Sequence, residues 1–249
     1  EILTGRDKGA ERAAKLAALA NGDIQILVGT HAVFQKDVHF HDLRLAVIDE
    51  QHRFGVSQRM ELGAKGRAVD VLVMTATPIP RSLSLAQYGD MDISVLDEKP
   101  PGRTPVQTAL VSTERMDEVI AKLQRAVAEG RQAYWVCPLV EESETLDMTA
   151  AEERFKRLRA VFGEGVVGLV HGQMPPAEKD AGMARFVAGE TKVLVATTVI
   201  EVGVNVPNAS IMLIERAETF GLAQLHQLRG RVGRGSAAST CLLMYQNPL

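Results

Sequence analysis

The chain has 249 residues, of which 46% are hydrophobic and 24% charged, and its formal net charge is −3. This composition is typical of a soluble globular protein, and the length allows one large domain or two of ordinary size. The negative net charge excludes a general electrostatic attraction to nucleic acid, so such binding would depend on a local basic strip, on backbone N–H groups or on helix N-termini. No apolar run approaches the ~20 residues that span a bilayer.

The first hundred residues predict short strands separated by a helix. Residues 10–20 are rich in Ala and Leu and are followed by Asn21-Gly22, which predicts a helix and its end. Apolar runs at 24–28, 45–48 and 71–74 predict strands. The segment 97–105 contains three prolines and a glycine and therefore predicts a linker.

Beyond residue 105 the alternation of strands and helices starts again. One helical face, with apolar residues from Met116 to Val127, ends at Gly130. Alternating strands and helices indicate βαβ units and parallel sheets, so we predict an α/β protein. The further helices are expected at 150–162, 176–187 and 222–229, and the strands at 107–111, 133–137, 166–170, 193–196, 211–214 and 240–245.

These patterns predict two lobes joined near residue 100. The boundaries are 1–98 for the first lobe, 99–105 for the linker and 106–249 for the second lobe. The chain opens with Glu1 rather than Met, which suggests a fragment, and the first lobe is expected to be truncated at its N-terminal side. Missing strands would leave apolar surface open to self-association. Cys137 and Cys241 lie inside apolar runs, as reduced core cysteines of a cytoplasmic protein do.

Two adjacent carboxylates follow the predicted strand 45–48. In a parallel sheet, ligands bind at the carboxyl ends of the strands, and this strand delivers Asp49 and Glu50 to that edge. Asp49 is suited to hold Mg²⁺ through water, and Glu50 to orient or deprotonate an attacking water molecule. The alternative is a pair of acidic residues on a solvated turn.

An arginine cluster near the C-terminus is the sharper signal. Arg229, Arg231 and Arg234 are separated by Gly230 and Gly233, which permit tight turns and close approach of the backbone. Forked guanidinium groups suit bidentate contact with phosphate, whereas a merely solvated basic face would more naturally use lysine. The acids and arginines together are parts of a nucleotide-hydrolysis site. The phosphate loop Gly-x-x-x-x-Gly-Lys-Ser/Thr is absent from these residues.

Hydroxyl groups follow three of the predicted strands. They occur at Thr75 and Thr77, at Thr197 and Thr198, and in Gly29-Thr30-His31. All of these hydroxyls could simply cap the strand ends. Those of Thr30, Thr197 and Thr198 are also suited to donate hydrogen bonds to nucleic-acid phosphates, contacts that position a protein without reading base sequence. Residues 75–81 are instead suited to pass the state of a bound nucleotide to a second lobe.

Several segments together resemble the superfamily 2 helicases, and among them the RecG family of ATP-dependent DNA helicases that remodel branched DNA. The resemblance runs essentially from end to end. Segments 97–103 and 139–143 favour this family over the Mfd family of transcription-repair coupling translocases, which shares the motor motifs and stays an alternative. The segments that carry the resemblance are 49–56, 75–81, 132–138, 170–174 and 224–235.

The resemblance implies two RecA-like α/β lobes with parallel sheets flanked by helices, and it implies ATP and Mg²⁺ as cofactors. Asn205 stands where the family usually has Asp, which puts its contact with the ribose in doubt. The implied roles are Asp49 for Mg²⁺; Glu50 as catalytic base; Arg231 and Arg234 as arginine fingers with Gln227 beside them; His52, Thr75 and Thr77 in coupling; Gly203 and Asn205 near the nucleotide; and Thr30, His31, His171, Thr197 and Thr198 at the DNA backbone.

The resemblance also implies a function. The expected activity is ATP-driven movement on branched DNA, including fork reversal and Holliday junction migration in DNA repair and recombination, by a monomeric motor in the bacterial cytoplasm. The family's phosphate loop and wedge domain would lie upstream of Glu1, and its further hairpin elements beyond Leu249. Because the phosphate loop is absent, an alternative for these residues alone is a non-catalytic module that binds the DNA backbone weakly.

Overall fold

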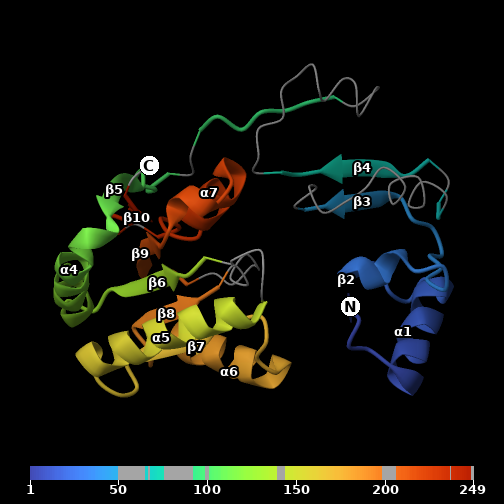
Figure 1. The fold of residues 1–249 in the computed structure, drawn as a ribbon. Helices are drawn as coiled ribbons and strands as arrows, with labels where there is room; N and C mark the ends of the chain where they lie inside the picture. Colours follow the sequence, from blue (N-terminus) through green and yellow to red (C-terminus); the bar gives the residue numbers. More distant parts are fainter. Residues whose placement is uncertain are drawn as a thin grey trace. The chain divides into compact units, whose positions relative to one another are not determined.

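The chain forms two compact units in a computed structural model, and each unit has its own parallel strands (Figure 1). The units are Glu1–Gly89 and Asp90–Leu249. The structure describes residues 1–49, 65–66, 68–75, 92–98, 101–138, 144–197, 206–235 and 237–247, without the side chains of residues 144–149. Of the helices in these ranges, none combines the length and the apolar character that crossing a membrane requires.

The first unit contains two parallel strand pairs and one α-helix. Strand β1 pairs with β2, and β3 pairs with β4. The helix ends at Gly22, which has a left-handed φ of +87° and donates its backbone N–H to the carbonyl of Leu19, as helix-terminating glycines do. The elements are β1 (Ile2–Leu3), α1 (Gly9–Asn21), β2 (Val28–Gly29), the 3-10 turn η1 (His31–Phe34), β3 (Leu45–Ile48) and β4 (Asp70–Val73).

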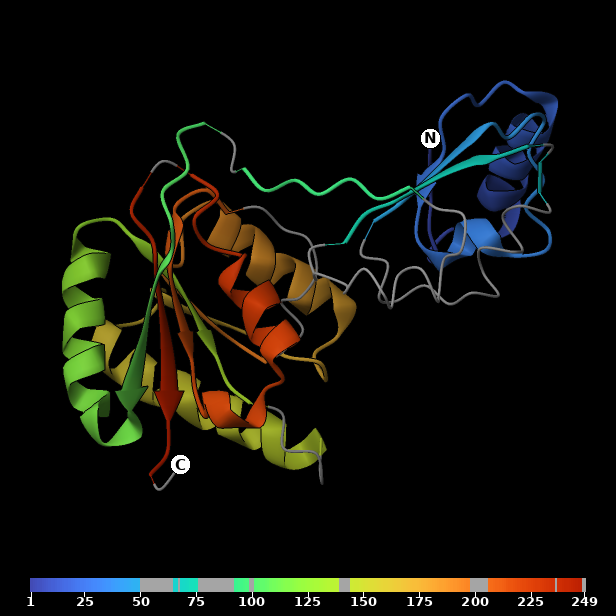
Figure 2. The same cartoon turned by 90° about the horizontal axis from the view of Figure 1, so that it is seen from above.

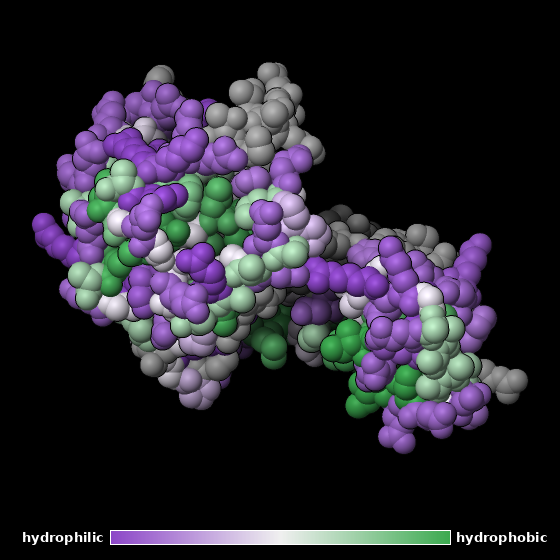
Figure 3. All heavy atoms as spheres, turned by 90° about the horizontal axis from the view of Figure 1, so that it is seen from below, coloured by the Kyte–Doolittle hydropathy of each residue, from purple (hydrophilic) through white to green (hydrophobic). Residues whose placement is uncertain are grey.

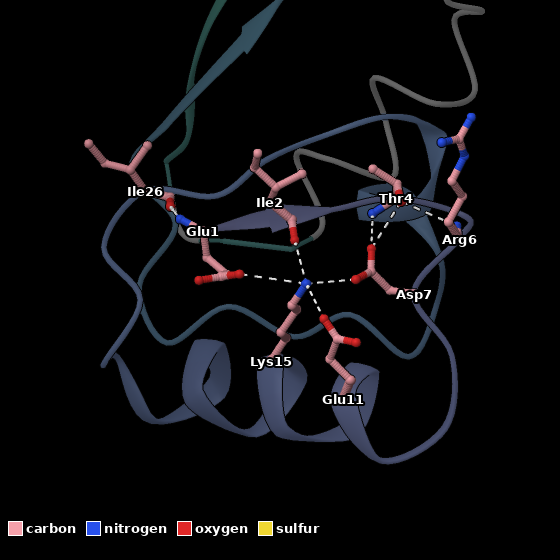
Figure 4. A network of polar contacts seen from close by, with 8 residues as sticks. All are labelled: Glu1, Ile2, Thr4, Arg6, Asp7, Glu11, Lys15 and Ile26. Carbon is pink, nitrogen blue, oxygen red and sulfur yellow. Dashed lines mark hydrogen bonds and ion pairs between the residues drawn. The ribbon is translucent and has the colours of Figure 1, made fainter. Parts of the chain in front are cut away.

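A network of charged groups fixes the segment between β1 and α1 (Figure 4). Lys15 donates to Asp7 at 2.6 Å and to the carbonyl of Ile2 at 3.1 Å. The second Asp7 oxygen accepts from the backbone N–H and the hydroxyl of Thr4, at 2.6 Å and 3.0 Å. The hydrogen bond from Lys15 and the one from the Thr4 backbone lower the pKa of Asp7 from 3.8 to about 2. Asp7 is therefore held in its charged form by partners that exist only in the fold.

We expect this network to make unfolding depend on pH in the acid range. A lowered folded-state pKa contributes stability above the ordinary value of 3.8, and that contribution is lost as the pH falls toward about 2. The melting temperature of the native chain should therefore fall more steeply across this window than that of an Asp7→Asn variant. Circular dichroism melts at a series of pH values measure the difference. Asp42→Asn is the matched control, since the Asp42 side chain is 59% exposed and should leave the slope unchanged.

Strand β3 of the first unit buries one face and exposes the other. Ala46 and Ile48 of β3 are buried, whereas Leu45 and Val47 are 58% and 54% exposed. Leu72, the register partner of Val47 on β4, is 51% exposed. Figure 3 shows hydrophobic residues, in green, at the surface among hydrophilic residues, in purple. Apolar side chains of β3 and β4 are thus exposed.

The second unit is built on a six-stranded, fully parallel sheet in the order β5-β10-β9-β6-β8-β7. Helices α4 and α5 cover one face, and α6 and α7 cover the other (Figure 2). The elements are β5 (Gln107–Ser112), η3 (Thr113–Arg115), α4 (Met116–Ala128), β6 (Gln132–Val136), α5 (Glu144–Phe162), β7 (Val167–Val170), α6 (Pro176–Val187), β8 (Val193–Ala196), β9 (Ala209–Ile214), η5 (Ala217–Thr219), α7 (Leu222–Arg229) and β10 (Thr240–Tyr245).

Two core clusters form because the strand side chains alternate between the faces. Trp135 of β6 packs in the cluster under α4 and α5, and its neighbour Tyr134 packs in the cluster under α6 and α7. Strands buried on both faces are expected of a parallel sheet between helical layers. The predicted parallel α/β architecture is therefore confirmed.

Most predicted elements agree with the structure to within two residues at each end, and two differ by more. The expected strand 24–28 is reduced to Val28–Gly29, because its partner β1 offers only Ile2 and Leu3 for pairing. Helix α5 begins at Glu144 rather than at residue 150. The prediction missed its first turns because their apolar residues, Leu146 and Met148, are two positions apart and do not form a helical stripe. The predicted ranges 45–48, 193–196, 222–229 and 240–245 match the structure at both ends.

Candidate functional site

Two of the predicted site residues of the first unit lie at the carboxyl edge of β3 and β4. Asp49 follows β3 and Thr75 closely follows β4, and the backbone N–H of Met74 donates to the carbonyl of Ile48 at 2.8 Å. Both Asp49 and Thr75 are exposed. The structure thus brings an acid and a hydroxyl together at the edge where parallel sheets bind ligands.

A cavity of about 1050 Å³ in the first unit is lined by Thr30, His31 and Asp49. Thr30 and His31 directly follow β2. The backbones of β1 and β2 approach so closely at Gly29 that an added Cβ would lie 2.2 Å from the carbonyl oxygen of Leu3. Three predicted residues from two strand ends therefore share one solvent-accessible hollow.

The donor chemistry at this hollow fits a magnesium nucleotide. Mg²⁺ prefers oxygen ligands, keeps most of its waters, and is usually held by one or two carboxylates together with phosphate oxygens. Asp49 supplies an exposed carboxylate at a strand end, and Thr75 supplies a hydroxyl at the same edge.

In the second unit, His171 and Thr197 lie side by side at the carboxyl edge of the sheet; we call them the edge pair. They directly follow β7 and β8, whose last residues Val170 and Ala196 are register partners. Both side chains are buried, at 6% and 2% exposure. Of the buried side-chain atoms that the structure describes, His171 Nδ1, Thr191 Oγ1 and Thr197 Oγ1 have no hydrogen-bond partner.

Buried polar atoms are nearly always hydrogen-bonded, and an unpaired one costs free energy. Two unpaired atoms at adjacent strand ends therefore make this edge a candidate binding site. A hydroxyl and an imidazole both suit a phosphate oxygen. The expectation that His171 and Thr197 act together is supported by their placement, whereas their assignment to the DNA backbone stays a prediction.

The arginines lie at the opposite, amino-terminal edge of the same sheet. Helix α7 leads into residues 231–235, which we call the arginine turn. A Cβ added to Gly233 would lie 2.6 Å from Cγ2 of Val106, which precedes β5, and one added to Gly235 would lie 3.1 Å from the carbonyl oxygen of Pro207, which precedes β9. The turn is therefore packed against residues that lead into two strands.

The guanidinium groups of the turn remain accessible. Arg231 is half-buried and Arg234 is exposed, and Nε of Arg234 donates to the carbonyl of Gly230 at 3.2 Å. Their positive field reaches Tyr134, where burial raises the pKa of the phenol to about 12 and both arginines oppose that rise. Gln227 is half-buried on α7 beside the fully buried Leu228, so the helix holds it close to the turn.

Several predicted site residues lie outside the described residues. They are Glu50, His52, Thr77, Thr198, Gly203 and Asn205.

The sequence did not single out a polar cluster of Trp135, Arg154 and Glu215, which we call the Arg154 cluster. Arg154 Nε donates to Glu215 Oε1 at 2.5 Å, and its terminal nitrogen donates to Oε2 at 3.1 Å. The indole N–H of Trp135 donates to the same carboxylate, and the Arg154 guanidinium lies 5.4 Å from the ring centroid. The only signal in the sequence is the acid Glu215 directly after the apolar strand β9.

Sequence comparison identifies helicase domains in both units. A DEAD/DEAH box helicase domain matches residues 2–85, and a helicase conserved C-terminal domain matches residues 114–236. The ATP-dependent DNA helicase RecG of Escherichia coli (strain K12) is 56% identical over 252 residues, which is 99% of this chain and 36% of that protein. The RecG of Thermotoga maritima is 52% identical over 98% of this chain and 31% of that protein. The chain thus spans about a third of the length of these relatives.

Structure comparison agrees. RecG bound to a three-way DNA junction superposes with a TM-score of 0.75 and 47% identity, over 99% of this chain and 32% of that one. The Mycobacterium smegmatis helicase Lhr bound to single-stranded DNA and AMP-PNP superposes with a TM-score of 0.71 at 16% identity, over 98% of this chain and 34% of that one. The latter shows the fold alone, and that fold is the RecA-like helicase core.

Proposed function

The chain belongs to the RecG family of helicases, and from this membership we propose that it is part of the motor of an ATP-dependent helicase that acts on branched DNA. The related RecG was solved on a three-way junction. The proposal includes fork reversal and Holliday junction migration in repair and recombination, by a monomer in the bacterial cytoplasm. It also includes the lobe boundaries 1–98 and 106–249 with a linker at 99–105.

One observation carries the proposal: each unit, taken by itself, presents side chains of a kind that phosphoryl transfer uses. The first unit has Asp49 at the carboxyl end of a parallel strand, beside a hollow. The second unit has Arg231 and Arg234 on a turn fixed by glycine contacts. An acid that holds a metal and arginines that contact the transferred phosphate are the recurring parts of nucleotide hydrolysis.

In this proposal different residues of the chain bind the metal, activate water, stabilise charge and couple hydrolysis to DNA contact. Asp49 would hold Mg²⁺ through its bound water, and Glu50 would orient the attacking water and accept its proton. The arginine turn would stabilise negative charge on the γ-phosphate oxygens. When bound, Mg²⁺-ATP supplies the phosphoryl group whose transfer to water drives the motor. His52, Thr75 and Thr77 pass the nucleotide state to the DNA contacts, and Gly203 and Asn205 lie near the nucleotide.

The nucleic-acid contacts are proposed to go to phosphates rather than to bases. The edge pair, Thr30, His31 and Thr198 provide hydroxyl and imidazole groups, which position a backbone without reading sequence. Since the net charge is −3, these local groups rather than overall charge would hold the DNA. A motor that reads only the backbone would recognise the shape of a branch and tolerate any base sequence.

The test is ATP turnover by the whole protein that carries this chain, measured without DNA, with linear duplex and with forked DNA of the same length. We expect forked DNA to stimulate turnover most, and we expect a Glu50→Gln variant to lose that turnover while it still binds the fork. Turnover that ignores DNA would contradict the helicase assignment. Equal stimulation by linear and forked DNA would contradict the branched substrate alone.

A further inference from the structure

Four side chains form a row along the carboxyl edge of the large sheet. Strands β9, β6, β8 and β7 are neighbours in that order, and backbone hydrogen bonds continue across their ends from Glu215 to Val136 at 2.9 Å and from Cys137 to Ala196 at 2.8 Å. The row consists of Glu215, Cys137, Thr197 and His171. Strand side chains alternate between the two faces, so these four face α4 and α5, as the side chains two residues earlier do. Those earlier side chains are Leu213, Trp135, Val195 and Leu169.

The edge pair thus lies at one end of a row whose other end belongs to the Arg154 cluster. Helix α5 packs on β7 and β8, the strands that carry the edge pair. Ala151 and Leu158 of α5 are fully buried, and Arg154 shares their helical face because it follows Ala151 by three residues and precedes Leu158 by four. Arg154 therefore points toward the sheet and ties the middle of α5 to the ends of β9 and β6.

The geometry of this ion pair differs from that of the surface pairs on the same helix. Arg154 and Glu215 are only 15% and 14% exposed and make two hydrogen bonds, with the Trp135 N–H sharing the carboxylate. Arg157, one turn away, bonds Asp117 through a single contact, and these side chains are 51% and 93% exposed. Exposed pairs contribute little, whereas a shielded bidentate pair fixes both direction and distance.

We propose that Arg154 is a positioning residue. Its contacts with Glu215 and Trp135 fix the position of α5 beside the edge pair, and the position of α5 shapes the site at which His171 and Thr197 bind a nucleic-acid phosphate. Arg154 acts through α5 and touches no substrate. The inference rests on the proposed binding of the nucleic-acid backbone by His171 and Thr197. It goes beyond that binding, since it names what holds the unpaired groups in place.

The test uses Arg154→Lys, which keeps the positive charge but removes the guanidinium group that makes two hydrogen bonds to Glu215. In the whole protein that carries this chain, we expect the half-saturating concentration of forked DNA to rise about threefold to tenfold, the worth of one or two hydrogen bonds. Turnover at saturating DNA should stay unchanged. Arg157→Lys is the matched control on the same helix and should change neither quantity. A merely structural role would instead lower saturated turnover or shift both variants alike.

Tryptophan emission gives a second, independent measurement. This measurement uses the 249-residue chain by itself, in which Trp135 is the single tryptophan and its indole contacts both members of the ion pair. Arg154→Lys should shift its emission and raise its quenching by acrylamide, while Arg157→Lys should not. If the shift occurs and DNA affinity is unchanged, the positioning role is wrong. Glu215→Gln is a further variant, and it should weaken DNA binding in the same way.

Thr197→Val separates this inference from the proposed function. If Thr197→Val does not weaken binding of forked DNA, the proposed phosphate-binding site at the edge pair is refuted, and the inference is refuted with it. If Thr197→Val weakens binding and Arg154→Lys does not, only the inference fails. If both are correct, the double variant should lose little more affinity than Thr197→Val alone, because groups that act through one contact are not additive.

Discussion

Replacing Arg234 by alanine is expected to lower ATP hydrolysis by about 10³- to 10⁵-fold, the range that arginine fingers contribute in related phosphoryl transfers. Arg234 is exposed, and among the described residues its side chain makes one hydrogen bond, to the carbonyl of Gly230, so its loss should hardly affect folding. Affinity for forked DNA should stay largely intact, because the edge pair lies at the opposite edge of the sheet. Single-turnover hydrolysis and fluorescence anisotropy with a labelled fork measure the two effects separately.

The controls for this variant test whether the effect belongs to the turn. Arg125→Ala removes another exposed arginine, from α4 on the other face of the sheet, and should leave hydrolysis unchanged. Arg234→Lys keeps the charge but loses the bidentate guanidinium group, and should recover only part of the activity. Unfolding of Arg234→Ala at the assay temperature would remove the case for a catalytic role, as would full activity.

The sequence could predict the architecture of the second unit because local signals there agree with the fold. Apolar runs such as Val193–Ala196 are buried on both faces, and Gly130 and Gly189 both adopt positive φ where helices end. In the first unit the signals are weaker. The ladder between β1 and β2 has only two residue pairs, so no periodicity could define its length. The first turns of α5 likewise lack the helical spacing of apolar residues from which a helix can be predicted.

Site residues that follow strands could be placed by their edge, because all strands of a parallel sheet end on one side. This applies to Asp49, Thr30, His171 and Thr197. The order of the strands could not be predicted, and it is the order that makes His171 a neighbour of Thr197. The Arg154–Glu215 pair spans 61 residues of sequence and depends on tertiary packing alone.

The position of the arginine turn was equally hidden, since it depends on α7 running back along the sheet. The contacts of Gly233 with Val106 and of Gly235 with Pro207 place the turn at the amino-terminal edge. The second unit therefore separates the two proposed tasks, with phosphate chemistry at one edge and DNA contact at the other. This separation is why the Arg234 and Thr197 variants are expected to affect different measurements.

Gly233 is the residue on which the shape of the arginine turn depends. Its φ is +77°, and an added Cβ would lie 2.6 Å from Cγ2 of Val106. A left-handed backbone costs a residue with a Cβ about 1–2 kcal/mol, and an overpacked contact about 1–3 kcal/mol more. Gly130 offers a matched comparison, because its φ is +88° and nothing lies within 4 Å of an added Cβ.

Gly233→Ala is therefore expected to lower the free energy of unfolding by about 2–5 kcal/mol, against about 1–2 kcal/mol for Gly130→Ala. Because the methyl group displaces the turn that carries Arg231 and Arg234, ATP hydrolysis should also fall at least ~10-fold in the folded fraction, since misplacement by about 1 Å costs up to 10² in rate. Urea unfolding and hydrolysis below the unfolding transition measure the two effects. Adding Val106→Ala removes the clashing methyl group and should restore part of both, while leaving the cost of the positive φ. No recovery in that double variant would show that the contact with Val106 does not hold the turn.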